Sequence, residues 1–282
     1  MPELFNRQWA LTIGDRQWTD LRVVFEINRN LSKRPDPAQI TIYNLAQQTR
    51  SGFAGGEQVR LVAGYGGAAG LIYSGTLTQI TPQRDGPDYA VSLTCRDGDA
   101  AVRSTIRQSY VSGAPLSIVV GNLVSAMGLS LGAGAAQQLA GKSTRGPVAH
   151  VGYANDKLEE ALVPFGLRYT LNDGTVQIIE DDGATSEEAV LLSPNTGLIG
   201  FPEPIVDSQR PTKKKKKQHA KRLRLTSLLQ PGLMPGRRVA LQGVPYAGVY
   251  RVDRLIHKGD SHGQDWYSVA ECTVVEGNIG IL

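Results

Sequence analysis

Residues 225–275 are the part of the chain that most constrains its fold. Apolar and β-branched runs alternate there with clusters of Pro and Gly, which break periodic structure. The segments 248–257 and 265–275 are rich in Val, Tyr, Trp, Ile and Thr, and the turn-forming residues 259–263 (GDSHG) separate them. This pattern predicts a long antiparallel hairpin. No grouping of side chains in it is typical of catalysis.

The first hundred residues repeat the alternation of short strands and turns. Residues 38–43 (AQITIY) alternate cleanly, so that Ile40 and Ile42 face one way and Thr41 and Tyr43 the other. Asn44 then predicts the N-cap of a short helix. Regular short strands with turns between them indicate a small antiparallel barrel or sandwich. The strands are expected at 8–13, 21–28, 38–43, 58–65, 71–80 and 89–95.

The middle of the chain changes character. Apolar residues from Leu116 to Met127 follow helical spacing, and Gly128 ends the run. A strand is expected at 148–153, and Asn155 predicts the N-cap of a second helix. The Asp173-Gly174 pair lies between two alternating runs, which is a strong hairpin signal. The middle is therefore expected to be a small α/β module of two helices and a hairpin.

This order defines the expected fold class, which is α+β and mainly β. We expect three domains in the 282 residues. A first β-barrel-like domain covers 1–105, an α/β insert covers 106–188, and a second β-barrel-like domain covers 189–282.

The two cysteines, Cys95 and Cys272, are too few for a disulfide framework, and both lie in strand-like runs. We expect buried free thiols, because free Cys packs as a small hydrophobe. The N-terminus lacks a basic region followed by an apolar run, and no apolar stretch is long enough to span a membrane. We therefore expect a soluble protein without membrane insertion, made in a cytoplasm.

The net charge of +4 is unevenly distributed. Residues 210–224 contain nine basic residues and no acidic one, so the rest of the chain is net acidic. Consecutive lysines repel one another and favour a solvated loop; they also attract phosphates in a salt-sensitive way. Both interpretations stay open for the lysine run, which consists of Lys213, Lys214, Lys215, Lys216 and Lys217.

Candidate catalytic and ligand-binding groups are sparse. Glu159-Glu160 and Asp181-Asp182 are adjacent pairs, whereas a hydrolase places its carboxylates on opposite sides of a bond. His257, Asp260 and His262 share one end of the expected hairpin, with no second cluster to complete a metal site. Residues 141–144 (GKST) lack the upstream Gly and the following helix of a phosphate-binding loop. We predict no catalytic residues, no cofactor and no metal.

Several segments, taken in order, resemble the baseplate hub proteins of long-tailed bacteriophages, the group of late control protein D and the Mu-like tail hubs. Each is short, but together they span most of the chain. They are AQITIYNLAQQTR (38–50), VRLVAGY (59–65), IYSGTL (72–77), LEEALVPFGLRYTLNDGTVQI (158–178), SLLQPGLMPGRRVAL (227–241) and GVYRVDRLIHKGDSHGQDWYS (248–268). The lysine run lies outside these segments.

The resemblance implies a structural virion protein of the tail baseplate, not an enzyme. It implies a homotrimer in which two related β domains per chain form a pseudo-six-fold ring. Such a ring is a symmetry adaptor between the six-fold tail tube and the three-fold central spike, with baseplate wedge or tape-measure proteins as further partners and DNA passing through. Apart from the resemblance, which assigns no role to the lysine run, the candidate contact residues are Lys213 to Lys217 and, on the long hairpin, Tyr250, His257 and Trp266.

Two other functions stay open from the residues. A cell-wall hydrolase of a tail tip would depend on carboxylates such as Glu159 or Glu160. A nucleic-acid-binding module would use Lys213 to Lys217 and bind in a salt-dependent way.

Overall fold

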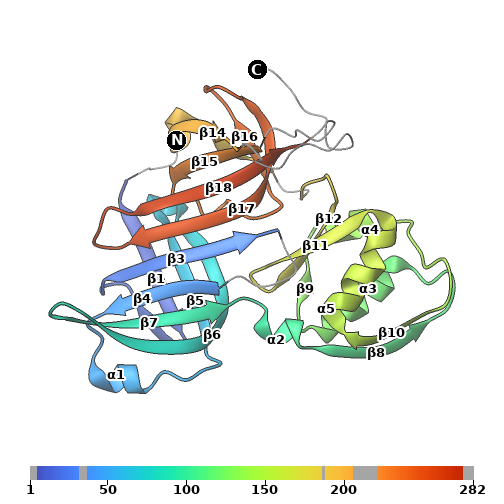
Figure 1. Cartoon of the computed structure of the whole chain (residues 1–282), viewed down its shortest axis with the longest axis horizontal. Helices are drawn as coiled ribbons and strands as arrows, with labels where there is room; N and C mark the ends of the chain where they lie inside the picture. Colours follow the sequence, from blue (N-terminus) through green and yellow to red (C-terminus); the bar gives the residue numbers. More distant parts are fainter. Residues whose placement is uncertain (1–4, 32–36, 186–187, 206–221, 276–282) are drawn as a thin grey trace.

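The computed structural model describes residues 5–31, 37–185, 188–205 and 222–275. The run from Lys213 to Lys217 lies outside these residues. The fold is dominated by one mainly antiparallel sheet of 13 strands, beside which an α/β insert is placed (Figure 1). The α+β, mainly β class expected from the sequence is confirmed.

Six strands form an N-terminal set, to which the short β2 (Arg16–Trp18) adds an edge. Between them lie a short helix, α1 (Gln47–Ser51), and the 3-10 turn η1 (Gly66–Ala68). The strands of the set are β1 (Arg7–Ile13), β3 (Val23–Asn30), β4 (Pro37–Tyr43), β5 (Gln58–Tyr65), β6 (Gly70–Asp85) and β7 (Asp88–Arg96).

Six more strands form a C-terminal set, with one 3-10 turn, η3 (Pro194–Thr196). They are β13 (Val190–Leu192), β14 (Leu198–Pro204), β15 (Arg222–Leu228), β16 (Arg238–Leu241), β17 (Gly248–Asp260) and β18 (Trp266–Val274). The long hairpin predicted at 248–275 is confirmed, because β17 and β18 pair antiparallel from Tyr250↔Val274 to Gly259↔Trp266.

The two sets share one strand order. Numbered by their place in the chain, the strands of each set follow the path 2-3-6-5-4-1 across the sheet. The longest hairpin of each set carries a bulge next to a buried cysteine: Leu77 pairs with Cys95 before one bulge, and Val252 pairs with Cys272 before the other. One difference separates the sets, since β1 pairs antiparallel with β5 whereas β13 pairs parallel with β16.

A single junction makes one sheet of the two sets. Strand β17 pairs antiparallel with β3, from Arg254↔Asn30 to Asp260↔Val24. Within the described residues, the ladder of each set stays open instead of closing on itself as a barrel. The outer edge of β3 is therefore occupied by the other set, and the barrel-like expectation is corrected to two open six-stranded units in one sheet.

Buried apolar residues form three clusters. The first belongs to the N-terminal set but also takes in Leu229 and Trp266 from the C-terminal part of the chain. The second lies in the insert and the third in the C-terminal set. The clusters agree in outline with three units, and the boundaries at 105/106 and 188/189 stay a prediction.

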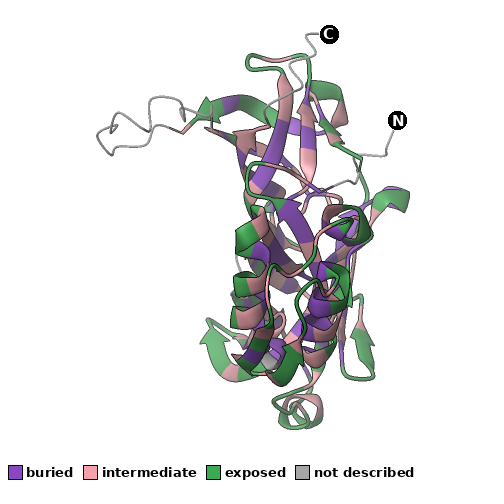
Figure 2. Cartoon of the chain, turned by 90° about the vertical axis from the view of Figure 1, so that its right-hand side faces the viewer, coloured by how far each residue is buried: buried purple, intermediate pink, exposed green. Residues whose placement is uncertain are grey.

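The insert packs two main helices against short sheets. Both predicted helices are found, as α3 (Leu116–Ala126) and α5 (Ala154–Leu162), and Figure 2 shows exposed residues on their outer sides. The Asp173-Gly174 hairpin is confirmed between β11 and β12. The other elements are α2 (Asp99–Val102), β8 (Thr105–Tyr110), β9 (Ser130–Leu131), α4 (Ala135–Leu139), β10 (Val148–Tyr153), η2 (Val163–Phe165), β11 (Leu167–Asn172) and β12 (Thr175–Glu180).

Both predicted asparagine caps are wrong. Asn44 lies three residues before α1, in the left-handed region with φ 55°, and its side chain bonds to Asp88 and to the backbone N–H of Tyr89. Asn155 lies inside the first turn of α5, where it is buried and makes no cap bond. Tertiary contacts take the Asn44 side chain away from the role that local sequence favours. At Asn155 the helix begins one residue earlier, at Ala154, so this asparagine lies past the cap position.

Candidate functional site

The three hairpin residues predicted to contact a partner lie inside the chain. Tyr250, His257 and Trp266 are 3%, 0% and 2% exposed. The indole N–H of Trp266 donates to the carbonyl of Gly64 at 3.2 Å, and the Tyr65 hydroxyl donates to the carbonyl of Trp266 at 3.1 Å. Trp266 therefore packs the hairpin against the N-terminal set, whereas Tyr250 belongs to the core of the C-terminal set and His257 contacts Ser268 of the same hairpin. The part of these three residues in an interface stays a prediction.

The surface that spans both sets is the polar face of the sheet. Side chains alternate along each strand, so that one face covers the apolar cores and the other carries polar groups. Cross-strand register places these polar groups in rows that continue over the β3–β17 junction. We define the polar face by Thr94, Gln39, Glu26, Lys258 and Tyr267 in one row and by Asn30, Arg254, Glu271, Arg224 and Glu203 in another.

Opposite charges neutralise one another across the polar face. Lys258 Nζ lies 2.9 Å from Glu26 Oε2 over the junction, and Arg224 lies 3.3 Å from Glu271 Oε1. The Lys258 bond lowers the pKa of Glu26 and the Glu26 bond raises that of Lys258, so both stay charged at neutral pH. The face is thus hydrophilic without a strong excess of either charge along these rows.

Each end of the sheet path has a strand that pairs on one side within the described residues. These strands are β2 and β14. On β14, Ile199 and Phe201 are 42% and 73% exposed, beside a bulge at which Gly200 has φ 68°. An edge strand with exposed apolar side chains is a ready surface for another chain.

An ion pair that sequence reasoning missed fixes the insert to the sheet. Arg29 of β3 is buried and donates to both carboxylate oxygens of Asp173, at 2.8 and 2.5 Å. Asp173 also accepts from the backbone N–H of Ser74, and its own N–H donates to Asp97. Burial, with Asp173 nearby, raises the pKa of Asp97. The sequence signalled Asp173 as a turn residue, and nothing local pairs it with Arg29, which is 144 positions away.

The candidate catalytic and metal-binding side chains do not converge. Glu160 forms an ion pair with Lys157 at 2.8 Å on α5. Asp260 pairs with Arg22, His262 contacts Ser261, and buried His257 contacts Ser268. Within the described ranges, no three His, Cys, Asp or Glu side chains form a group that could hold a metal ion.

The segment 141–144 uses its polar groups within the insert. Lys142 Nζ donates to the carbonyl of Gln138, and the Thr144 hydroxyl donates to that of Val111. Ser143 forms a β-bridge with Pro115. The next element after these residues is strand β10 and not a helix, so the donors of a phosphate-binding loop are not assembled here.

Both cysteines are buried free thiols, as expected. Burial raises the pKa of Cys95 to about 12 and raises that of Cys272. Among the residues that the structure describes, no helix has the length and apolar character needed to cross a membrane.

Comparison with known proteins gives matches in structure alone. No family model matches the chain, and no curated protein matches its sequence. A 43 kDa tail protein of prophage MuSo2 from Shewanella oneidensis is similar with a TM-score of 0.64 at 9% identity, over 95% of this chain and 98% of that one. A tail protein from Neisseria meningitidis MC58 reaches 0.63 at 15% identity, over 95% and 97%.

A third similar structure comes from a secretion system. The Escherichia coli c3393 protein, a type VI secretion component described as similar to the T4 tail proteins gp27 and gp5, reaches a TM-score of 0.57 at 14% identity. The match covers 95% of this chain and 77% of that one. The chain therefore has the fold of phage tail proteins, which confirms the resemblance drawn from the sequence at the level of the fold.

Proposed function

We propose that the chain is a structural baseplate hub of a phage tail. In this role three copies form a pseudo-six-fold ring between the six-fold tail tube and the three-fold central spike. The observation that carries the proposal is the repeated strand order, 2-3-6-5-4-1 in both sets. One chain thus holds two similar units, so three chains offer six similar units to a six-fold partner. The tail-protein fold of the similar structures supports the same role.

The polar face is our candidate for the surface that lines the ring. One of its rows runs from β7 to β18 and the other from β3 to β14, so the face belongs to both units of the chain. Basic side chains on it are held by acids, as in Lys258–Glu26 and Arg224–Glu271. DNA binds proteins mainly through unpaired basic groups that release counterions. A lining of paired charges lets DNA pass without holding it.

The edge strands are our candidates for contacts between protomers. A closed ring of identical chains uses two different surfaces in each contact. Strand β14 carries the exposed Phe201, and β2 lies at the far end of the same sheet path. Joining the end of one protomer to the other end of the next removes edges that would otherwise promote aggregation.

In this proposal each of the three predicted domains has its own role. The units within 1–105 and 189–282 form the ring, and the insert within 106–188 decorates its outside. Tube and spike bind opposite sides of the ring, and wedge or tape-measure proteins are further partners. The protein works in the tail of the virion after assembly in the host cytoplasm, and its role is structural, not catalytic.

The experiment that tests the proposal measures mass and symmetry together. Purified protein is examined by light scattering coupled to size exclusion, and the same fraction is imaged by electron microscopy. We expect three times the mass of the chain and a ring with six similar lobes. A monomer at high concentration, both alone and with the tube protein added, would contradict the proposal.

A further inference from the structure

The junction inside the chain is a template for a contact between two copies of it. Within the chain, the second strand of the N-terminal set, β3, pairs with the fifth strand of the C-terminal set, β17. The same contact between copies would join the second strand of a C-terminal set, β14, to the fifth strand of the next N-terminal set, β6. Figure 1 shows β14 near the top of the sheet and β6 near the bottom, with β17 and β3 between them. Repeating one head-to-tail contact is how identical chains close a ring.

The second half of β6 offers the same edge that β17 gives to β3. Strand β17 pairs with β16 up to Arg251 and with β3 from Arg254, on the two sides of its bulge. Strand β6 likewise pairs with β5 up to Thr76, just before its own bulge. Beyond the bulge, residues 79–85 pair with β7 alone among the residues that the structure describes. Most of these residues are exposed, so the edge is open to another strand.

The repeat also gives the register of the contact. The bulges beside the two cysteines align β6 with β17, so that residues 79–85 correspond to 254–260. Strands β4 and β15 each pair with the strand that carries the cysteine, which aligns Glu203 of β14 with Glu26 of β3. The register that joins Glu26 to β17 therefore places Glu203 opposite Gln83 of the neighbouring copy.

Aromatic side chains at the two edges match those of the internal junction. Across β3 and β17, Phe25 packs edge-on against Trp266 with ring centroids 5.4 Å apart. In the N-terminal set Tyr89 takes the place of Trp266, and on β14 the bulge that contains Phe201 takes the place of Phe25. Phe25 and Trp266 are buried, whereas Tyr89 and Phe201 are 41% and 73% exposed. The chain thus exposes on its two edges the counterparts of the pair that it buries at the junction.

Polar groups along the edges fit the same register. Gln83 places an amide donor opposite the carboxylate of Glu203, at the point where the internal junction has an ion pair. Pro82 lies opposite Pro204, and since neither has an N–H, no donor is left unbonded there. Prolines on an edge also disfavour pairing with other strands. The contact between copies therefore has fewer ladder hydrogen bonds than the internal junction.

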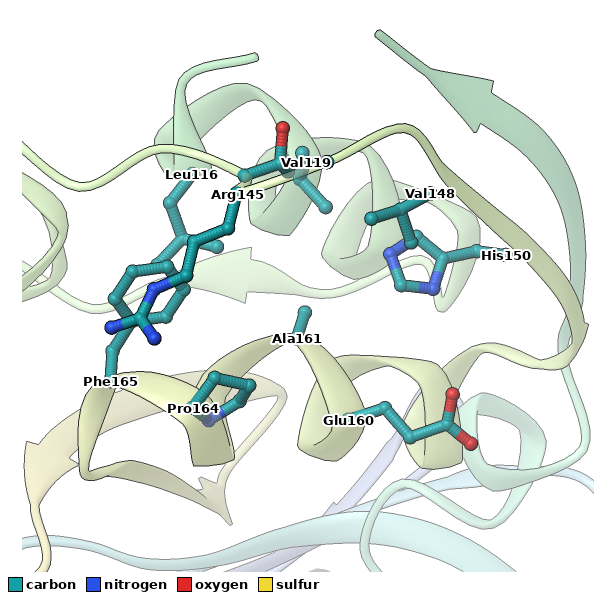
Figure 3. Close-up of a pocket in the computed structure, with 11 residues that line it drawn as sticks. Leu116, Val119, Arg145, Val148, His150, Glu160, Ala161, Pro164 and Phe165 are labelled. Atoms are coloured by element: carbon teal, nitrogen blue, oxygen red, sulfur yellow. The ribbon is translucent and has the colours of Figure 1, made fainter. Parts of the chain in front are cut away.

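The insert stands outside this repeat. It holds a cavity of about 320 Å³ between α3, the end of α5 and β10, with a mostly apolar wall (Figure 3). The elements that line the cavity do not belong to the strand path of the two sets. The cavity therefore takes no part in the contact, and exposed residues of the insert can serve as controls.

We propose that β14 pairs with residues 79–85 of β6 in a second copy of this chain, with Phe201 against Tyr89 and Glu203 opposite Gln83. This contact rests on the ring proposed above and names the strands that close it. It selects β6 instead of β2 as the partner of β14. The reason is that the internal junction uses the fifth strand of the C-terminal set and not its end strand, β13.

The first test is a cysteine cross-link in the whole protein. Gln83→Cys and Glu203→Cys are combined in one chain, and oxidation should join the copies into covalent dimers and trimers on a non-reducing gel. Residues directly opposite on antiparallel strands have Cβ atoms about 4.5–5.5 Å apart, which small movements close to a disulfide. The natural thiols, Cys95 and Cys272, are buried and do not compete.

The matched control combines Glu203→Cys with Gln17→Cys, which is exposed on β2. This pair should not cross-link. Light scattering of wild type gives the mass of the assembly independently of any cross-link. Cross-linking of the Gln17 pair instead, or of neither pair, in a protein of trimeric mass would overturn the β6 contact and leave the ring standing. A monomeric wild type would overturn both.

The second test measures the aromatic contact without a cross-link. Phe201→Ala and Tyr89→Ala should each raise the concentration at which the trimer dissociates by about two- to tenfold, as for other aromatic pairs. Because both variants remove the same contact, the double variant should exceed either single one only slightly. Val111→Ala, exposed in the insert, should leave dissociation unchanged. Circular dichroism compares the fold of the variants with that of wild type. Independent effects of the two substitutions, or none, would overturn the assignment of Phe201 to Tyr89.

Discussion

At the scale of single residues, the fold strongly changes the chemistry of His257. It is fully buried, its Nδ1 lies 2.8 Å from Ser268 Oγ, and Nε2 has no partner. Burial, with Arg29 nearby, lowers its pKa to about 3. Between pH 6.5 and 3 the unfolded chain therefore holds a proton that the folded chain does not. The contribution of His257 to stability is complete above pH 6.5 and falls as the pH decreases.

A prediction follows for His257→Asn, which keeps a polar group near Ser268 but cannot titrate. The free energy of unfolding of wild type should fall relative to that of the variant by about 1.4 kcal/mol per pH unit below pH 6. Urea unfolding at several pH values between 4.5 and 7.5 measures this difference. His262→Asn, on the exposed turn of the same hairpin, should show the same pH dependence of the unfolding free energy as wild type. If the difference in unfolding free energy between wild type and His257→Asn does not change with pH, then the fold does not prevent His257 from binding a proton.

The ion pair of Arg29 with Asp173 gives a second prediction. Asp173→Asn keeps a residue that tolerates φ 50° but removes the carboxylate that binds the buried guanidinium of Arg29 through both oxygens. We expect a loss of about 3 kcal/mol in unfolding free energy, as for other broken buried pairs. Asp97→Asn is the matched control and should cost no more than about 1 kcal/mol, because Asp97 already repels Asp173. Equal losses in chemical denaturation would argue against a special role of the Arg29 pair.

At the scale of elements, local sequence pattern predicted most hairpins and helices. It did not predict which distant strands pair with one another. The 248–275 hairpin, the Asp173-Gly174 hairpin and both main helices follow from alternation, turn residues and helical spacing. The union of β3 with β17 does not, because it depends on the complementarity of edges more than 200 residues apart. The same distance explains why Trp266 seemed a contact residue, although it belongs to the N-terminal core.

The β3–β17 junction can be tested at Gly259, which pairs with Phe25. A Cβ built at Gly259 would overlap the ring of Phe25, so Gly259→Ala forces the two strands apart. We expect a loss of about 1–3 kcal/mol in unfolding free energy, as for other overpacked cores. Adding Phe25→Leu should recover part of the loss.

The matched control for Gly259 is Gly121→Ala in α3, where a Cβ meets nothing within 4 Å. It should raise the unfolding free energy by up to about 1 kcal/mol through helix propensity. Thermal and urea unfolding of the four proteins distinguish the effects. A neutral Gly259→Ala would show that the junction adapts more easily than its packing indicates.

For the whole molecule, the residue pattern predicted the order of β, α/β and β segments, whereas two related β domains were expected only through the resemblance to tail hubs. The two sets share a strand order and a bulge beside a cysteine, yet the buried positions differ: Val91 and Leu93 of β7 correspond to Ser268 and Ala270 of β18. The two sets share which face of each strand is buried, but not which residues are buried there. A candidate surface such as the polar face, made of rows from several strands, emerges only when register is known.

A last prediction concerns the role of the edge strand β14 in the assembly. Ile199→Lys with Phe201→Lys places two charges on the exposed edge, where pairing with another chain would bury them. If β14 joins protomers in the trimer, the double variant should have the mass of one chain by light scattering. Its protomer should stay folded, because both side chains are exposed. Val111→Lys, at 76% exposure in the insert, is the control and should remain trimeric. A double variant that stays trimeric would assign the protomer contact to another edge, with β2 the next to test.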